Sequence, residues 1–252
     1  MYDEVSIFTA ANLLREARRQ KNISHSAVPK ICILDPDGDI VQWLTVTQQA
    51  KHDPNWTCYH TDLVRFHWND VEFGIIGRAV GASFAVLLAE EMFASGCELL
   101  ISVTSSGQIT PLGEPPYFIL IDKALRDEGT SYHYLPPSDF SLLAPSLAQL
   151  LEDQFETMPI PVYRGATWTT DAPFRETKTA IEVAADLGIL AVEMEAAALY
   201  AFAEARQKSV VCFAHVTNQM AQETGDFEKG VENGSQDALA IIQRAAERWL
   251  NR

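Results

Sequence analysis

Short apolar runs alternate with longer amphipathic segments along most of this chain. The apolar runs predict buried strands at Pro29–Leu34, Leu99–Val103, Phe118–Ile121, Val162–Thr167, Ile189–Val192 and Ser209–Val216. Apolar residues at helical spacing predict helices at Thr9–Gln20, Gly81–Ser95, Ser138–Phe155, Glu176–Leu187, the alanine-rich segment ending at Arg206, and Ser235–Leu250. Strands that alternate with helices in this way indicate a largely parallel sheet with helices on both faces.

Turn-forming residues mark where several of these elements end. Asn69-Asp70 separates two strand-like segments, Leu63–Trp68 and Val71–Ile76, and predicts a two-residue hairpin turn. The polar segment Thr104–Gln108 is expected to form a loop after its strand. No repeat or linker divides the chain, so we expect one α/β domain over residues 1–252, with a mixed, largely parallel central sheet flanked by helices.

Composition narrows the class of protein. The 34 acidic and 19 basic residues give a net charge of -15, which argues against a nucleic-acid or anionic-membrane partner. The N-terminus shows no signal-peptide pattern, and no apolar window is long enough to span a membrane. Four scattered cysteines without a C-x-x-C pair suit reduced, packed thiols, so we expect a cytoplasmic protein. The histidines lack metal-ligand spacing, and we expect neither a metal nor an organic cofactor.

The most informative segment is the junction after Ile189–Val192, where Glu193, Met194 and Glu195 precede a strong helix-forming pattern. Ligands of open α/β sheets bind beyond the carboxyl ends of strands. A carboxylate there can accept hydrogen bonds from two adjacent sugar hydroxyls, and a thioether suits the apolar face of a sugar. The alternative is ordinary helix stabilisation, because acids in a first turn contribute about 0.3–1 kcal/mol each.

Four segments in order resemble one known family. Val192–Ala198 resembles the ribose-binding motif of the nucleoside phosphorylase superfamily, in its uridine phosphorylase-like branch. The Arg-Asp-Glu-Gly-Thr-Ser loop in Leu120–Ser131, the Thr-Thr-Asp-Ala-Pro-Phe-Arg-Glu segment in Gly165–Thr177, and His215–Gln219 are similar to segments of the same family. The resemblance implies phosphorolysis of an N-glycosidic bond, with phosphate as co-substrate, no organic cofactor, and a homo-oligomer that is a dimer or a hexamer.

The resemblance also implies roles for individual residues. Glu195 would accept hydrogen bonds from the ribose 2′ and 3′ hydroxyls, and Arg175 would stabilise negative charge on the departing base. The Asn218 amide favours a pyrimidine or 6-oxopurine base, since it cannot donate a proton as an acid does. Further substrate contacts are expected from Met194, Glu193, Thr104, Ser105, Ser106, Gly107 and Asp171. A surface ion pair for Arg175, a loop brace for Asp171 and a structural role for Asn218 stay open as alternatives.

The expected phosphate site departs from the family pattern. Relatives end their first strand in Gly-Asp-Pro-x-Arg, whereas Leu34–Ile40 carries three acids and no arginine. Ser102 stands where a second arginine is expected. The remaining candidates to hold phosphate are Arg78, Gly38 and Ser105, although Arg78 could instead pair with the acids.

Two other functions therefore stay open besides phosphorolysis. One is a nucleoside hydrolase that uses water, and the other is a nucleoside- or base-binding protein without turnover. His60, Arg65 and His67 lie where a neighbouring subunit of a relative would lend a residue, although their alternation also suits a half-exposed strand. Every version of this interpretation requires a cavity that reaches the Glu195 carboxylate.

Overall fold

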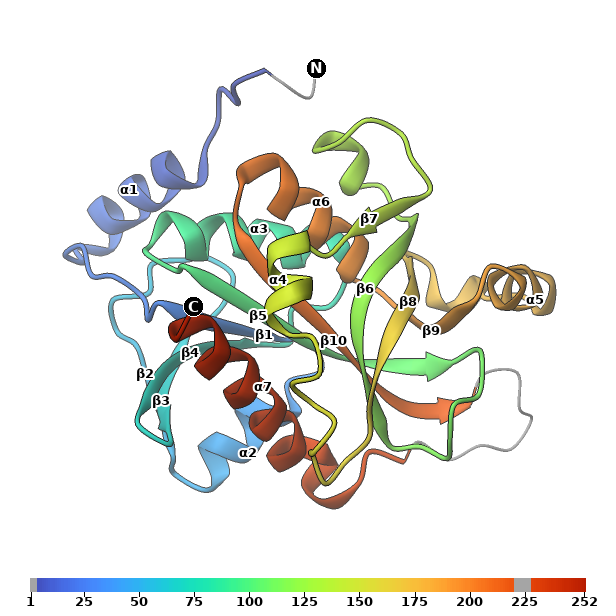
Figure 1. The fold of residues 1–252 in the computed structure, drawn as a ribbon. Coiled ribbons are helices and arrows are strands. Elements are labelled where there is room, and N and C mark those ends of the chain that lie inside the picture. Colours follow the sequence, from blue (N-terminus) through green and yellow to red (C-terminus); the bar gives the residue numbers. More distant parts are fainter. Residues whose placement is uncertain (1–3, 220–227) are drawn as a thin grey trace.

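A single mixed sheet joins the ten strands found in the computed structural model, which describes residues 4–219 and 228–252 (Figure 1). The strands are β1 Ile31–Asp35, β2 Ala50–His52, β3 Val64–Trp68, β4 Val71–Gly77, β5 Leu99–Gln108, β6 Tyr117–Asp127, β7 Phe140–Leu142, β8 Val162–Thr170, β9 Ile189–Glu193 and β10 Ser209–Gln219. Their order is β10-β6-β8-β9-β5-β1-β4-β3-β2, with β7 on β6. The sheet is mixed, as predicted: the two longest ladders, β5–β10 and β6–β8, are parallel, and the ten pairings of the described strands divide equally into five parallel and five antiparallel.

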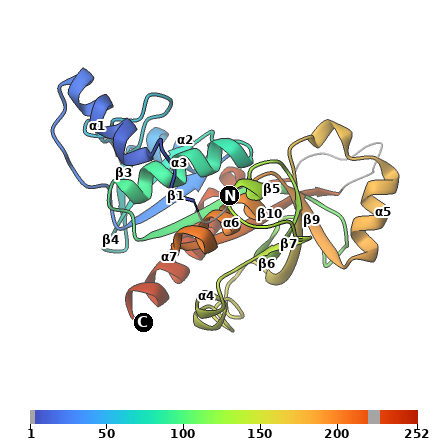
Figure 2. The ribbon, with the colours of Figure 1, turned by 90° about the horizontal axis from the view of Figure 1, so that it is seen from above.

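Seven helices and three short 3₁₀ turns accompany the sheet within these described ranges. The helices are α1 Ala10–Lys21, α2 Asp39–Val46, α3 Ala82–Ala94, α4 Pro145–Leu150, α5 Lys178–Asp186, α6 Ala196–Arg206 and α7 Ser235–Leu250, and the 3₁₀ turns are η1 Ser131–His133, η2 Pro173–Arg175 and η3 Val231–Gly234. Helix α3 packs against α1 and α6 on one side of the sheet, and α2 packs against α7 on the other (Figures 1 and 2). The chain is an α/β domain of the predicted class.

A closed ring of strands positions the site. Strand β5 pairs with both β9 and β10, and the path β10-β6-β8-β9 completes the ring. Gly107 of β5 is opposite Val192 of β9 and also opposite Asn218 of β10. The ring therefore gathers the ends of β5, β9 and β10, three strands that are distant in sequence.

Helix α6 explains the run of alanines after the two acids. Every residue from 196 to 203 is buried, so the helix has no solvent-facing side over this length. Small side chains let it lie close to α3 and to strands β6, β7, β8 and β10. The Tyr200 hydroxyl donates to the Ile121 carbonyl oxygen at 2.6 Å and accepts from the Cys212 N–H at 3.1 Å, which links the helix to β6 and β10.

Several local predictions are confirmed. The β3–β4 hairpin turns at Asn69 and Asp70, whose φ angles of 45° and 67° are those of a type I′ turn. Helix α1 lies where the amphipathic pattern predicts it, and the structure adds that the Thr9 hydroxyl caps it by accepting the Asn12 N–H. Gly96 has a φ of 106° just after the C-terminus of α3, as expected for a glycine that ends a helix. The four cysteines are free and buried.

Other local predictions are wrong, each for a physical reason. Thr104–Gln108 is not a loop but the end of β5, because β9 and β10 supply backbone partners on both sides. Ser138–Phe155 holds only β7 and the short helix α4, since the backbone of β7 pairs with β6 and Pro145 begins the helix. Helix α2 and strand β2 were not predicted.

Within the described part of the chain, no helix combines the length and the apolar character needed to cross a membrane.

The amphipathic helix α7 provides a test of the core. Ile242 is fully buried, so Ile242→Ala is expected to lower the free energy of unfolding by about 2–5 kcal/mol. The exposed Arg248 on the same helix offers a control, because Arg248→Ala should stay within about 0.5 kcal/mol of the unchanged chain. Urea unfolding followed by circular dichroism measures both. Equal losses in the two variants would contradict the assigned packing of α7.

Candidate active site

Glu193, the last residue of β9, is held entirely by the protein. Its Oε1 accepts from the hydroxyls of Thr167, at 3.1 Å, and Thr169. Its Oε2 accepts from the backbone N–H groups of Glu195 and Ala196, each at 2.7 Å. Both oxygens are thus occupied by donors from β8 and from the start of α6. In this arrangement Glu193 orders the strand-to-helix junction, which is the structural alternative to the substrate contact predicted for it.

Glu195, at the N-cap position of α6, has a different environment. Its side chain is 1% exposed, and one carboxylate oxygen accepts the Gly81 N–H at 2.7 Å. The other oxygen, Oε2, is buried without a hydrogen-bond partner among the described residues. Burial, and then the nearby charge of Glu193, raise the pKa of Glu195 from 4.5 to about 8. The Thr104 hydroxyl lies close enough to this carboxylate to lower its pKa, yet no described donor makes a hydrogen bond of good geometry to Oε2.

The polar end of β5 lies beside this junction. Thr104, Ser106 and Gly107 are buried and Ser105 is half-buried. The Ser106 hydroxyl has no hydrogen-bond partner among the described residues. Asn218, half-buried on β10 opposite Gly107, accepts from the Thr217 hydroxyl at 3.3 Å. The ring of strands brings this predicted set together with Glu195, while the half-buried Met194 lies between the two acids in the chain.

An acidic cluster occupies the end of β1, where phosphate is expected. Asp35 is buried and accepts the N–H groups of Gly38, at 3.1 Å, and Val41, at 2.9 Å, which fixes the start of α2. Asp37 accepts the Ser105 N–H at 2.8 Å. Burial raises the pKa of Asp35 to about 7. A carboxylate thus already uses the backbone N–H of Ser105, a residue predicted to hold phosphate.

The cation nearest this cluster is Lys229, which the sequence analysis did not identify. Its Nζ lies 2.6 Å from an Asp39 oxygen and 3.9 Å from an Asp37 oxygen. Asn233, in the left-handed region with φ of 56°, also donates to Asp39 at 3.0 Å. The lysine is more than 180 residues from the acids in sequence, so only the tertiary structure reveals the pairing.

A small cavity lies within the cluster. The aspartates at 35, 37 and 39 line it together with Thr104, Ser105, His215 and Asn233, and its volume of about 10 Å³ suits roughly one water molecule. His215 stacks on Phe118 with 4.3 Å between ring centroids, and its Nε2 is buried without a partner in the described structure. Burial, and then the charge of Lys229, lower the pKa of His215 to about 4, so this imidazole is neutral at neutral pH.

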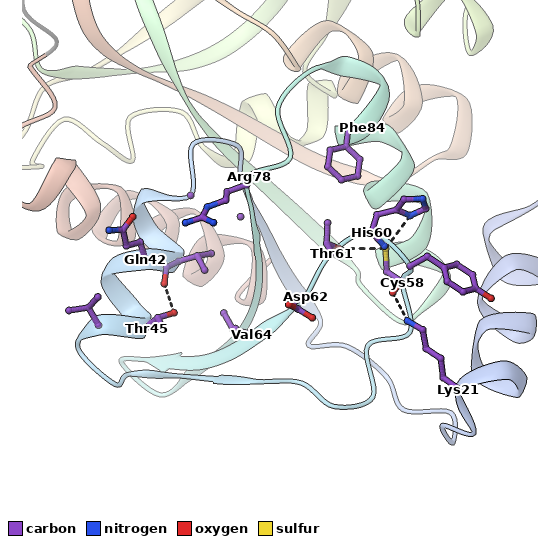
Figure 3. A pocket seen from close by; sticks show the side chains of 15 residues that line it. Lys21, Gln42, Thr45, Cys58, His60, Thr61, Asp62, Val64, Arg78 and Phe84 are labelled. Atoms are coloured by element: carbon purple, nitrogen blue, oxygen red, sulfur yellow. Dashed lines mark hydrogen bonds between the residues drawn. The ribbon is translucent and has the colours of Figure 1, made fainter.

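Arg78 and Gly38 line a second, larger cavity of about 710 Å³ (Figure 3). The aliphatic stem of Arg78 crosses Gly38 so closely that a Cβ at Gly38 would lie 2.8 Å from the Arg78 Cγ. Arg78 is exposed and forms no ion pair within residues 4–219 and 228–252, so the alternative pairing with the aspartates is not seen. Neither of these two cavities is lined by Glu195, so neither provides the access to its carboxylate that the sequence interpretation requires.

The loop after β8 carries the remaining predicted residues. Asp171 accepts the Gly129 N–H at 2.9 Å and so braces the neighbouring loop. Arg175 is exposed on η2, and its guanidinium contacts no carboxylate in the described residues. The adjacent Glu176 is half-buried, and burial raises its pKa to about 7.

The Arg-Asp-Glu-Gly-Thr-Ser segment is a structural loop. Arg126 is buried and donates to the hydroxyls of Ser131 and Ser138, at 2.8 and 2.7 Å. Glu128 accepts the N–H groups of Thr130 and Ser131. The motif thus satisfies its own polar groups and supports η1.

The chain is similar to known proteins both in sequence and in fold. A model of the phosphorylase superfamily matches residues 30–247. The crystal structure of uridine phosphorylase from Vibrio fischeri ES114 with 6-hydroxy-1-naphthoic acid is similar in fold, with a TM-score of 0.72 and 18% identity over 93% of this chain and 99% of that one. A second crystal structure of that enzyme gives a TM-score of 0.70, again at 18% identity, over 91% and 95%.

Two relatives are similar in sequence. An uncharacterised protein of Acanthamoeba polyphaga mimivirus is 28% identical over 171 residues, 68% of this chain and 64% of the relative. This chain thus spans less than two thirds of that relative. A purine nucleoside phosphorylase of Plasmodium vivax is 24% identical over 187 residues, 71% of this chain and 76% of the relative.

The raised pKa of Glu195 gives a test of its environment. Between its ordinary value of 4.5 and about 8 the folded chain keeps a proton that the unfolded chain has lost. Its contribution to stability is therefore full below pH 4.5 and is lost as pH rises through about 8. Glu195→Gln removes this loss, so the Tm of the variant minus that of the unchanged chain should increase between about pH 5 and pH 9.

The exposed Glu182 on α5 serves as the control, because Glu182→Gln should give a curve of Tm against pH parallel to that of the unchanged chain. Parallel curves for Glu195→Gln as well would show that the carboxylate is not in the electrostatic environment described.

Proposed function

The chain belongs to the phosphorylase superfamily, and on that premise we propose that it cleaves the N-glycosidic bond of a nucleoside and transfers the pentose to phosphate. The products are a free base and a pentose 1-phosphate. In this reaction the bond between C1′ and the base nitrogen breaks, a phosphate oxygen bonds to C1′, and the departing base carries the electron pair.

The observation that carries this proposal is the unpartnered Oε2 of Glu195. A buried carboxylate oxygen without a donor costs free energy, and a ligand hydroxyl removes that cost. Glu195 keeps its proton in the free chain up to about pH 8, so it must lose this proton as the pentose binds. Two neighbouring pentose hydroxyls then supply two donors, and the resulting carboxylate holds the sugar as C1′ gains positive charge. Because the side chain is 1% exposed, entry of the pentose requires local movement of the protein around it.

Asn218 and Arg175 are the residues we propose for the base. Asn218 lies opposite Gly107 and so faces the same end of β5 as the pentose site. Its amide pairs with a carbonyl and N–H edge, as in a pyrimidine or a 6-oxopurine. The exposed Arg175 needs to turn toward the base to stabilise its charge, and Phe174 beside it is fully exposed in the single chain. A second copy of the chain packed on this loop would cover Phe174 and bring Arg175 closer to the base. A homo-oligomer therefore stays among the predictions.

Phosphate binding is the step for which the chain must rearrange. Arg78, the Gly38 backbone and the Ser105 N–H are the proposed contacts, and Lys229 adds a second cation. Asp37 has to release the Ser105 N–H, and Asp35 the Gly38 N–H, before phosphate oxygens can accept from these groups, because carboxylate and phosphate are both anions.

Water is a second candidate acceptor, and the acidic cluster favours it. The cavity beside Asp35 and Asp37 fits about one water molecule, and no arginine lines it. A carboxylate next to a water is suited to remove its proton as the oxygen attacks C1′. Hydrolysis does not require Asp37 to release the Ser105 N–H. Its product is free pentose in place of pentose 1-phosphate.

A panel of pyrimidine and purine nucleosides, assayed for free base with and without phosphate, tests the proposal and separates the acceptors. Phosphorolysis predicts release that depends on phosphate and a pentose 1-phosphate product, whereas hydrolysis predicts equal release in phosphate-free buffer. Glu195→Gln should lower kcat/KM by about 10²–10³, the loss typical of one preorganised polar contact to a transition state. Glu182→Gln should leave it unchanged, and absence of any base release from the unchanged chain would leave only a binding protein.

Asp37→Asn distinguishes the two acceptors inside the site. If phosphate is the acceptor, loss of this negative charge should lower the KM for phosphate, because the carboxylate competes for the Ser105 N–H. If water is the acceptor and Asp37 removes its proton, the same variant should lose about 10²–10⁴ in kcat. Steady-state kinetics against phosphate concentration gives the answer.

A further inference from the structure

A second group of reactive side chains lies outside the proposed nucleoside site. Cys58 and His60 are in the irregular segment between β2 and β3, and Glu91 is on the third turn of α3. The Cys58 sulfur, a His60 ring nitrogen and a Glu91 carboxylate oxygen all lie within 4.8 Å of one another. Thirty-one residues separate His60 from Glu91, so the cluster is produced by the fold.

Glu91 is the residue that most needs a partner. Its side chain is 1% exposed, and the Cys58 thiol is the side-chain hydrogen-bonding group within reach of its carboxylate. Neither carboxylate oxygen makes a hydrogen bond of good geometry with the described residues. Buried carboxylates in proteins are normally hydrogen-bonded, paired or bound to a metal. This one lies against a thiol and an imidazole.

Contacts within its own loop fix the position of the Cys58 sulfur. The sulfur accepts the His60 N–H at 3.3 Å and the Thr61 hydroxyl at 3.5 Å (Figure 3). Lys21 holds the same backbone, with its Nζ 2.8 Å from the Cys58 carbonyl oxygen and 3.1 Å from that of Thr57. The sulfur is therefore positioned by contacts on its own loop and is aimed at α3.

The distances suit a small metal ion. The Cys58 Sγ and the His60 Nδ1 are 3.9 Å apart. Two such ligands of a tetrahedral zinc ion, with Zn–S of about 2.3 Å and Zn–N of about 2.0 Å, lie roughly 3.5 Å apart. A small change of side-chain torsion closes the difference. One thiolate and one carboxylate also balance the two positive charges of the ion.

The larger cavity gives this group an open side. Cys58 and His60 line its wall, and Arg78 and Lys21 line it as well (Figure 3). Three protein ligands leave a fourth position of a tetrahedral ion for water or a ligand. Soft sulfur together with imidazole nitrogen selects zinc over magnesium or calcium.

We propose that Cys58, His60 and Glu91 bind one zinc ion, which ties the segment between β2 and β3 to helix α3. The spacing of the histidines in the sequence predicts no metal site. Glu91 lies on a helix distant in sequence from Cys58 and His60, so the spacing of the histidines does not reveal it as a ligand.

Metal titration tests this site without reference to enzyme activity. The chain is dialysed against chelator and then titrated with Zn²⁺ and, separately, with Co²⁺. We expect one equivalent of zinc per chain by elemental analysis, a higher Tm with zinc, and a thiolate-to-cobalt charge-transfer band. Cys58→Ser should abolish that band. His60→Gln and Glu91→Gln should weaken zinc binding at least tenfold, since even indirect partners of a metal site contribute that much.

Two matched controls and a folding check keep the result decisive. His67→Gln replaces an exposed histidine on β3, and Cys97→Ala replaces another buried thiol, so neither should change zinc affinity. Glu91→Gln should keep its circular dichroism spectrum and lose only the zinc-dependent rise in Tm. Zinc binding that is absent from the unchanged chain, or equal in all three ligand variants and the controls, would overturn the proposal.

Discussion

The candidate site depends on how two buried acids are accommodated where β9 passes into α6. Glu193 satisfies both of its oxygens with four donors from β8 and from the start of α6. Since those donors are used, they cannot also serve Glu195, which receives one backbone N–H from the N-cap of α3. One acid therefore stabilises the junction, and the other is left with an unused oxygen and a raised pKa.

The charge balance at the end of β1 is the second constraint. Three aspartates converge on a space of about one water molecule, and Lys229 and Asn233 compensate part of their charge. An anion that enters has to displace Asp37 from the Ser105 N–H, whereas a neutral acceptor does not. Membership of the superfamily does not by itself establish whether phosphate or water accepts the pentose. The acidic cluster bears on this choice, because it has aspartates where the resemblance implies arginines.

Helix α3 connects the separate parts of the molecule. Its N-cap, Gly81, donates to Glu195, and its third turn carries Glu91 toward Cys58 and His60. A ligand that fixes the far end of this helix therefore acts on the element that also contacts the proposed pentose-binding acid. The larger cavity is lined by Phe84 of α3 and also by Arg78 and Cys58.

Elements whose patterns are local could be predicted from the sequence. The I′ hairpin at Asn69-Asp70, the apolar face of α7 and the junction after β9 depend on neighbouring residues, and each is where the pattern predicts it. The partners of the buried polar groups, by contrast, follow from the tertiary fold. Whether Thr104–Gln108 is strand or loop depends on β9 and β10, and Lys229 reaches the acids at 37 and 39 from the far end of the chain. The pairing of buried polar groups is non-local, because donors and acceptors meet through the closing of the strand ring, and sequence spacing does not record that closure.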